Sequence, residues 1–288
     1  MLAATVLIWA FNFTVTKYAL EHGFEPVAYS IMRYGAAAVL FAGLTYGLEG
    51  SVRVRRRDVG LLLVAAAIGV WLNQVSYVYA LEFTTASTTA LILGSTPIFA
   101  ALFAFAVGLE RLRGRFWLAT LISFAGVGLV AAGAGGGFSA DVRGNLLGVA
   151  TAATWAAYSV AIAPLMRSYS PLRISAFVLA AGWLPLAATG AVQVARQDFH
   201  LESLVWAGLA YAIVGPLFLT NILWFTAVHR VGPSRATLIA NVQPFIAAVF
   251  AVLILSERMT ALQVAGGVAI ALAILLARRE ELPVRGSG

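Results

Sequence analysis

Polar and aromatic side chains recur at helical spacing inside the long apolar runs of this sequence. In the first run, Thr5, Trp9, Asn12 and Thr16 share one face of a helix. Hydrogen-bonding groups beside aromatic rings suit a pocket for a small zwitterionic or aromatic molecule. Later runs carry the same combination. The full set expected to contact a solute is Trp9, Asn12, Asn73, Tyr77, Trp155, Tyr158, Thr220, Trp224, Asn241 and Arg33. Each residue also has a purely structural alternative, because polar groups in apolar helices form hydrogen bonds with neighbouring helices or with their own backbone.

Two basic residues, Lys17 and Arg33, lie inside apolar runs. A charge at the centre of a bilayer costs about 3 kcal/mol on insertion scales. Lys17 is within one turn of the end of its run, so its ammonium can reach the interface. Arg33 lies deeper, and two outcomes are open for it: pairing with helix-end carbonyls, or facing a cavity where it attracts a carboxylate.

The residue types that are missing limit the chemistry. The chain has no cysteine, which removes disulfides, thiolate metal sites and cysteine nucleophiles. All twelve acidic residues lie in loops or at the ends of runs, and no His or Asp lies mid-run to activate a serine. We therefore expect no enzyme activity, no cofactor and no metal.

The composition predicts an integral membrane protein. Hydrophobic residues make up 61% of the 288 positions and charged residues only 11%, too little polar surface for a soluble protein of this size. Ten runs are long enough to cross a bilayer. They are Leu2 to Leu20, Pro26 to Leu48, Val59 to Ala80, Thr84 to Leu109, Gly114 to Ala132, Gly144 to Met166, Pro171 to Ala195, Ser203 to Val228, Pro233 to Leu255 and Thr260 to Ala277.

The basic residues predict the orientation. Fourteen of the nineteen lie in the loops after even-numbered runs or in the C-terminal tail, and three lie in the loops after odd-numbered runs. Under the positive-inside rule, both termini face the cytoplasm. The net charge of +7 is therefore explained by orientation, and we expect no nucleic-acid partner.

One stretch occurs twice. Leu91 to Arg111 and Leu238 to Arg258 align without a gap at an offset of 147 positions, and each copy contains a proline, Pro97 or Pro244. A proline inside a helix removes a backbone hydrogen bond, so we expect both to be kinks that bend during gating, with a fixed packing kink as the alternative.

The repeat extends over both halves of the chain, which are divided by the glycine-rich loop from Gly133 to Gly144. Because each half holds an odd number of runs, the second half must begin on the opposite side of the membrane, which makes the halves inverted repeats. We expect one five-helix repeat over residues 1–135, a second over 144–278, and a cytoplasmic tail over 279–288. The final Gly-Ser-Gly of that tail looks like a cloning remnant.

Several motifs recur in order across nearly the whole chain. They are the Trp-Ala-Phe-Asn-Phe segment from Trp9 to Phe13, Lys17, the spacing from Pro26 to Arg33, and the two proline-containing helices that end at Glu110-Arg111 and Glu257-Arg258. In these features the chain resembles the drug/metabolite transporter superfamily, in the branch with two EamA-type domains. The resemblance implies ten helices in a basket around a central cavity and export of metabolites such as amino acids, nearest to the aromatic amino acid exporters.

The expected function is therefore export of a small metabolite, most simply an amino acid, across a bacterial inner membrane by alternating access. The expected partners are this solute and membrane lipid, and the internal duplication favours a monomer. The alternative is a proton-coupled exporter of drugs or organic cations, but small multidrug exporters of the superfamily carry a glutamate in the first span where this chain has Asn12. That difference favours a facilitator.

Overall fold

The computed structural model describes residues 1–108, 114–133, 138–231 and 239–278, and within this part all regular secondary structure is helical and no strand is present. Seven helical stretches in this part are long and apolar enough to cross a membrane. Three shorter apolar stretches follow at Ser203–Leu219, Gln243–Ile254 and Ala261–Ala277. The predicted all-helical membrane class is confirmed.

The helices follow one another in the order of the predicted runs. Their bounds are α1 Leu2–Glu21, α2 Pro26–Glu49, α3 Arg56–Ala66, η1 Ala67–Leu72, α4 Asn73–Phe83, α5 Ala86–Leu93, α6 Thr96–Ala106, α7 Gly114–Gly133, α8 Phe138–Ile162, η2 Leu165–Arg167, α9 Pro171–Arg196, α10 Ser203–Ala212, η3 Ile213–Leu219, α11 Thr220–Val231, α13 Gln243–Ile254 and α14 Ala261–Arg278. The predicted loop up to Gly144 is too long, because α8 already begins at Phe138. A helix can start in polar residues before its apolar run, since acidic residues favour a helix N-terminus.

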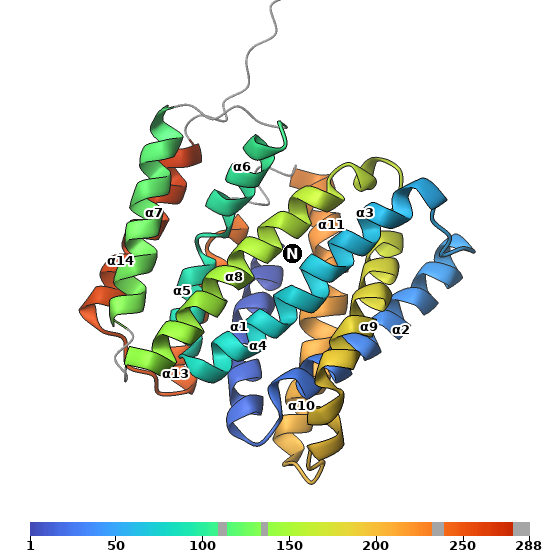
Figure 1. The fold of residues 1–288 in the computed structure, drawn as a ribbon, viewed down its shortest axis with the longest axis horizontal. Helices are drawn as coiled ribbons and strands as arrows, with labels where there is room; N and C mark the ends of the chain where they lie inside the picture. The colour runs from blue at the N-terminus through green and yellow to red at the C-terminus, as the bar shows by residue number, and fades with distance from the viewer. Residues whose placement is uncertain (109–113, 134–137, 232–238, 279–288) are drawn as a thin grey trace, which may run out of the picture.

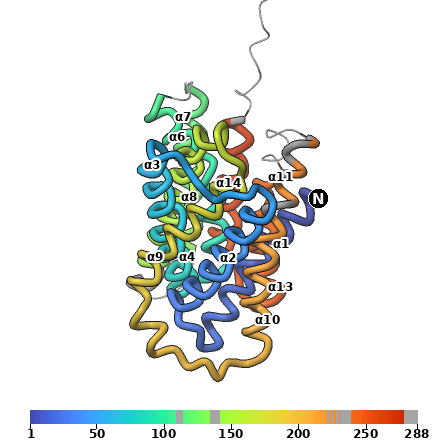
Figure 2. Tube along the Cα trace, turned by 90° about the vertical axis from the view of Figure 1, so that its right-hand side faces the viewer, coloured from blue at the N-terminus to red at the C-terminus, as the bar shows by residue number. Residues whose placement is uncertain are grey.

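Two extensive helix pairs form the edges of the bundle. Helix α7 packs against α14 at one edge, and α2 packs against α9 at the other (Figure 1). Seen from the side, α3, α4 and α8 lie on one side of the molecule and α1, α11 and α13 on the other (Figure 2). The pairs α4 with α8 and α1 with α13 are the next most extensive contacts. Segments from both halves of the chain therefore share one bundle.

Two glutamines at the C-terminal end of α9, Gln193 within it and Gln197 directly after it, satisfy amides at the start of α2. Gln197 Oε1 accepts a hydrogen bond from the backbone N–H of Glu25 at 2.7 Å, and Gln193 Oε1 accepts one from Val27 at 2.7 Å. The first N–H groups of a helix have no partner within the helix, so these side chains act as its cap. They fix α2 in register with α9, which positions the residues further along α2.

The helices of both halves are interrupted at corresponding places. The π-helical turns η1 and η3 begin at residues 67 and 213 and join α3 to α4 and α10 to α11. A second interruption, at residues 94–95, separates α5 from α6, and a turn at 241–242 precedes α13. Interrupted helices in membrane proteins commonly mark functional sites, because they free backbone groups to bind.

Helices α7 and α14 touch through glycine. A Cβ placed at Gly126 would lie 2.8 Å from the carbonyl oxygen of Gly266, and one placed at Gly266 would lie 2.5 Å from that of Gly126. Small residues at such a crossing let two backbones approach closely in a membrane.

We predict that Gly126→Ala lowers the thermal stability of the purified protein, because the added methyl group separates the two backbones and overpacking costs about 1–3 kcal/mol. The matched control is Gly128→Ala, two residues along the same helix, where a Cβ meets no atom within 4 Å. Thermal unfolding in detergent measures both variants. Equal melting temperatures for the two variants would contradict the close crossing.

Candidate functional site

Asn12 of α1 and Tyr77 of α4, both in the predicted set, meet in the interior. The amide Nδ2 of Asn12 donates to the hydroxyl of Tyr77 at 3.3 Å, and both side chains are buried. The ring of Tyr77 also lies edge-on to Phe13, with centroids 5.5 Å apart. Asn12 Oδ1 is buried and has no hydrogen-bond partner. One acceptor in this contact is therefore available to another molecule.

Arg33 of α2 is buried beside these residues. Its side chain is only 4% exposed, and its guanidinium carbon lies 5.1 Å from the ring centroid of Tyr34 and 5.9 Å from that of Tyr29. The nitrogens Nε and Nη1 have no hydrogen-bond partner. In the described part of the chain no helix-end carbonyl accepts from these two nitrogens, so this first alternative for Arg33 does not account for them.

Six side chains of α1, α2 and α4 make up this group, which we call the arginine cluster: Asn12, Thr16, Tyr29, Arg33, Tyr34 and Tyr77. The hydroxyls of Thr16 and Tyr29 lie 3.5 Å apart and connect α1 to α2. Tyr29 and Tyr34 are absent from the predicted set, although Tyr29 stands one helical turn before Arg33 and so shares its face. A search of the neighbours of Arg33 at helical spacing would have found it.

Trp9 of α1 and Trp224 of α11 are also brought together. Their ring centroids lie 5.4 Å apart, and Trp9 Nε1 donates to the carbonyl oxygen of Pro216 at 3.2 Å. The hydroxyl of Thr220 donates to the same carbonyl. The hydroxyl of Thr220 therefore has its hydrogen-bond partner in its own helical stretch, which is the structural alternative for this residue.

Trp155 and Tyr158 of α8 form an aromatic pair with centroids 5.5 Å apart. Trp155 is 46% exposed, whereas Tyr158 is partly buried against η1. A Cβ at Gly69 would lie 2.3 Å from Cδ2 of Tyr158, so only glycine fits under this ring. Gly69 and Pro216 stand 147 positions apart, and each π turn thus faces an aromatic residue of α8 or α1.

Asn73 joins two helices. Its Nδ2 donates to the backbone oxygen of Thr151 and to the hydroxyl of Thr154, both at 3.0 Å, and its Oδ1 accepts from Gln74 at 3.0 Å. These bonds fasten α4 to α8 and use most of the capacity of the amide. Of the two alternatives for Asn73, contact with a solute or a hydrogen bond between helices, the structure shows the hydrogen bond between helices.

The repeated prolines differ from the predicted kinks in their position. Pro97 and Pro244 lie in the first turn of α6 and α13, so each follows a break between two helical segments. Proline is well tolerated there, because its missing N–H would have no partner in the helix. Asn241 lies at the break before α13, half-buried, and its Nδ2 is buried without a hydrogen-bond partner.

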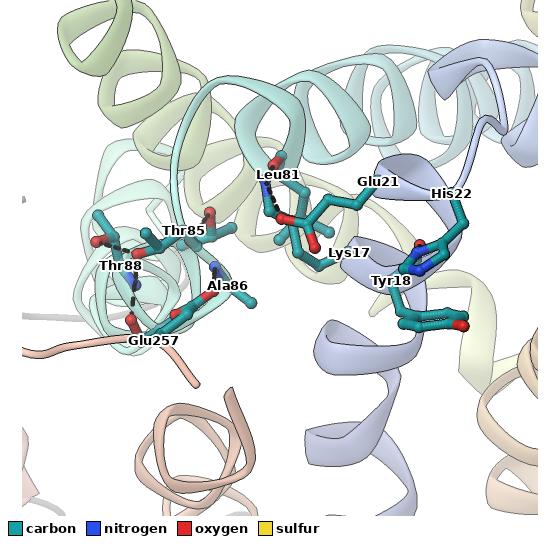
Figure 3. Close-up of polar contacts among 11 residues, drawn as sticks. Lys17, Tyr18, Glu21, His22, Leu81, Thr85, Ala86, Thr88 and Glu257 are labelled. Atoms are coloured by element: carbon teal, nitrogen blue, oxygen red, sulfur yellow. Dashed lines mark hydrogen bonds and ion pairs between the residues drawn. The ribbon is translucent and has the colours of Figure 1, made fainter. Parts of the chain in front are cut away.

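A carboxylate outside the predicted set caps one of the broken helices. Glu257 Oε1 accepts from the backbone N–H of Ala86 at 2.7 Å, and Oε2 accepts from that of Ser87 at 2.9 Å (Figure 3). A carboxylate at a helix N-terminus neutralises the unpaired amides and the positive end of the helix dipole. The counterpart Glu110 lies outside the described residues.

Lys17 finds its partners at the ends of two helices. Its Nζ donates to the carbonyl oxygen of Leu81 at 2.7 Å and lies 3.4 Å from Oε1 of Glu21 (Figure 3). This charge therefore has its partners at the ends of α1 and α4 and is not available to a solute in the arginine cluster.

Comparisons with known proteins agree with a transporter. The model of the EamA-like transporter family matches residues 1–132 and 142–279. The protein named uncharacterized transporter YetK from Bacillus subtilis is 25% identical over 89% of this chain and 79% of its own length. The protein named probable terminal-alkyne amino-acid exporter from Streptantibioticus cattleyicolor is 25% identical over 98% of this chain and 93% of its own.

A similar fold is known from crystallography. One crystal structure of a protein superposes with a TM-score of 0.67 over 96% of this chain and 95% of that one, at 19% sequence identity. At this identity the likeness concerns the fold alone.

We predict that Glu257→Ala lowers the melting temperature in detergent. The change leaves two backbone amides of α5 without partners, and hydrogen bonds to a charged group contribute about 1.5–3 kcal/mol. Glu82→Ala is the control, because Glu82 is an exposed glutamate near the end of α4. A melting temperature for Glu257→Ala as high as that of the control would contradict the capping role.

Proposed function

The chain belongs to the EamA-like transporter family, and on this premise we propose that it exports small metabolites, most simply aromatic or other amino acids. Family and relatives are transporters, so the protein is a transporter and not an enzyme. The observation that carries the choice of substrate is its similarity, over 98% of its length, to a protein named as an amino-acid exporter. The polar and aromatic groups of the interior suit such a solute.

The proposed architecture is ten transmembrane helices in two inverted five-helix repeats, over residues 1–135 and 144–278. Supporting contacts come in corresponding pairs: α1 packs on α13 as α8 packs on α6, and η3 contacts α2 as η1 contacts α9. In this proposal the protein is a monomer surrounded by lipid in the bacterial inner membrane. Both termini face the cytoplasm, since most basic residues lie on that side.

The proposed solute contacts are Trp9, Asn12, Tyr77, Trp155, Tyr158, Trp224, Asn241 and Arg33. Asn73 and Thr220 remain in the proposed set with a supporting role, since their bonds to α8 and Pro216 orient the neighbouring aromatic side chains. Alternating access requires the helices to move around the site, and we propose that the breaks before Pro97 and Pro244 are where they bend.

The proposed transport is facilitative. In the described part of the chain, each carboxylate whose burial is known lies at a helix end or in a loop. Proton exchange usually relies on a carboxylate within the membrane, whose burial moves its pKa toward neutral pH. A solute that moves down its own gradient needs no such group.

We predict that Trp155→Ala and Asn241→Ala each slow amino acid efflux from proteoliposomes by about tenfold, the effect of losing about 1.4 kcal/mol of solute contact. Trp117→Ala is the control, because Trp117 of α7 is also 46% exposed but belongs to the edge pair of α7 and α14. Initial rates are compared at equal amounts of reconstituted protein. Wild-type rates in both site variants would remove these residues from the site.

We also predict that labelled amino acid equilibrates across the proteoliposome membrane and that an imposed pH gradient leaves the final distribution unchanged. The physical reason is the lack of a proton-binding group among the interior residues described above. Empty liposomes in the same gradient provide the control for leakage. Accumulation driven by the gradient would contradict the facilitator and favour a proton-coupled exporter.

A further inference from the structure

Arg33 is a buried cation without a compensating anion in the described part of the chain. A guanidinium stays charged at any physiological pH, so burial cannot neutralise it by loss of a proton. Its side chain is 4% exposed, and neither Nε nor Nη1 has a hydrogen-bond partner. Leaving a charge and its donors unpaired in a low-dielectric interior is strongly destabilising.

The described carboxylates do not serve this guanidinium. Those that are partly buried have other partners: Glu49 pairs with Arg173 at 2.7 Å, Asp58 accepts from Tyr169 at 2.6 Å, and Glu257 caps α5. The others are exposed to solvent, namely Glu21, Glu25, Glu82, Asp198 and Glu202. Asp198 is bound to His200, whose hydrogen bonds lower the pKa of that carboxyl.

The surroundings of Arg33 are suited to a solute with an aromatic or apolar body. The rings of Tyr29 and Tyr34 lie within 6 Å of the guanidinium and stabilise the charge only in part, through cation–π attraction. Tyr29 links this guanidinium to α1, because its hydroxyl lies 3.5 Å from that of Thr16, and one turn earlier on α1 Asn12 is bonded to Tyr77. Unpaired donors on Arg33 and the unpaired acceptor Asn12 Oδ1 therefore belong to one cluster.

We propose that Arg33 binds the carboxylate of the transported solute and that Asn12 Oδ1 accepts a hydrogen bond from its ammonium group. This inference rests on the proposed function and adds the orientation of the solute to it. A carboxylate matches the missing charge of the cluster and forms charge-assisted hydrogen bonds with a guanidinium. Since Arg33 is occluded, the helices around the cluster must part before the solute can enter.

The test measures the melting temperature of the purified protein with four probes at equal ionic strength: phenylalanine, its decarboxylated counterpart phenethylamine, benzoate and inorganic phosphate. In the wild type, phenylalanine and benzoate raise the melting temperature, whereas phenethylamine and phosphate do not. Arg33→Met abolishes the effect of benzoate and raises the melting temperature without ligand, because it removes an uncompensated buried charge. If Arg33 instead stabilised the fold through its own hydrogen bonds, Arg33→Met would lower the melting temperature without ligand.

Further variants keep the test decisive. Arg33→Lys keeps the charge but loses the guanidinium geometry, so it binds benzoate at least about tenfold more weakly than the wild type. Arg33→Gln replaces the Met variant if that one does not fold. Arg196→Met is the matched control, since Arg196 is exposed at the end of α9, and it leaves the benzoate response unchanged.

Two results would overturn the proposal: an undiminished benzoate response without the charge of Arg33, or stabilisation of the wild type by phosphate as large as by benzoate. The second would assign the cluster to phosphate, free or in a lipid headgroup. Failure of the proposed function is distinct from both. Proteoliposomes that move no amino acid, together with an Arg33-dependent benzoate response, would mean that the transported solute is another carboxylate.

Discussion

The need to satisfy every backbone polar group without water governs this structure. The middle of a helix meets this need by itself, but helix ends and interruptions leave backbone groups that another segment can satisfy. Glu257 accepts hydrogen bonds from the first amides of α5, and the carbonyl oxygen of Pro216 accepts one from the indole N–H of Trp9. Because Glu257 and Trp9 lie far along the chain from the groups they bind, both bonds also fasten the bundle together.

The arginine cluster follows from the same constraint applied to side chains. Capping by Gln193 and Gln197 fixes the start of α2 against α9, and this register places Arg33 among tyrosines of α2 and α4. The ammonium of Lys17 has a hydrogen-bond partner at a helix end, whereas two nitrogens of Arg33 have no hydrogen-bond partner. In a proposed transporter, these unpaired nitrogens are groups that a negatively charged solute can bind.

The two halves repeat the backbone more faithfully than the chemistry. Asn73 corresponds to Thr220 and Tyr77 to Trp224 at the offset of 147. Arg33 corresponds to Val178 at the offset of 145 that relates Pro26 to Pro171. Similar interruptions in both halves suit helices that move in a coordinated way. The buried guanidinium of Arg33, in contrast, has no counterpart of the same charge in the other half.

The sequence alone determined the membrane class, the helical runs and the family, because hydrophobic length and the repeat spacing are local properties of the chain. It also placed Asn12 and Tyr77 on polar faces that do meet. Tertiary structure decided which polar groups remain available: Asn73 and Thr220 are bound within the bundle, whereas Asn12 Oδ1, Asn241 Nδ2 and Arg33 keep unpaired atoms. Helical phase indicates the direction of a side chain but not its partner, since partners come from other helices whose packing only the folded chain defines.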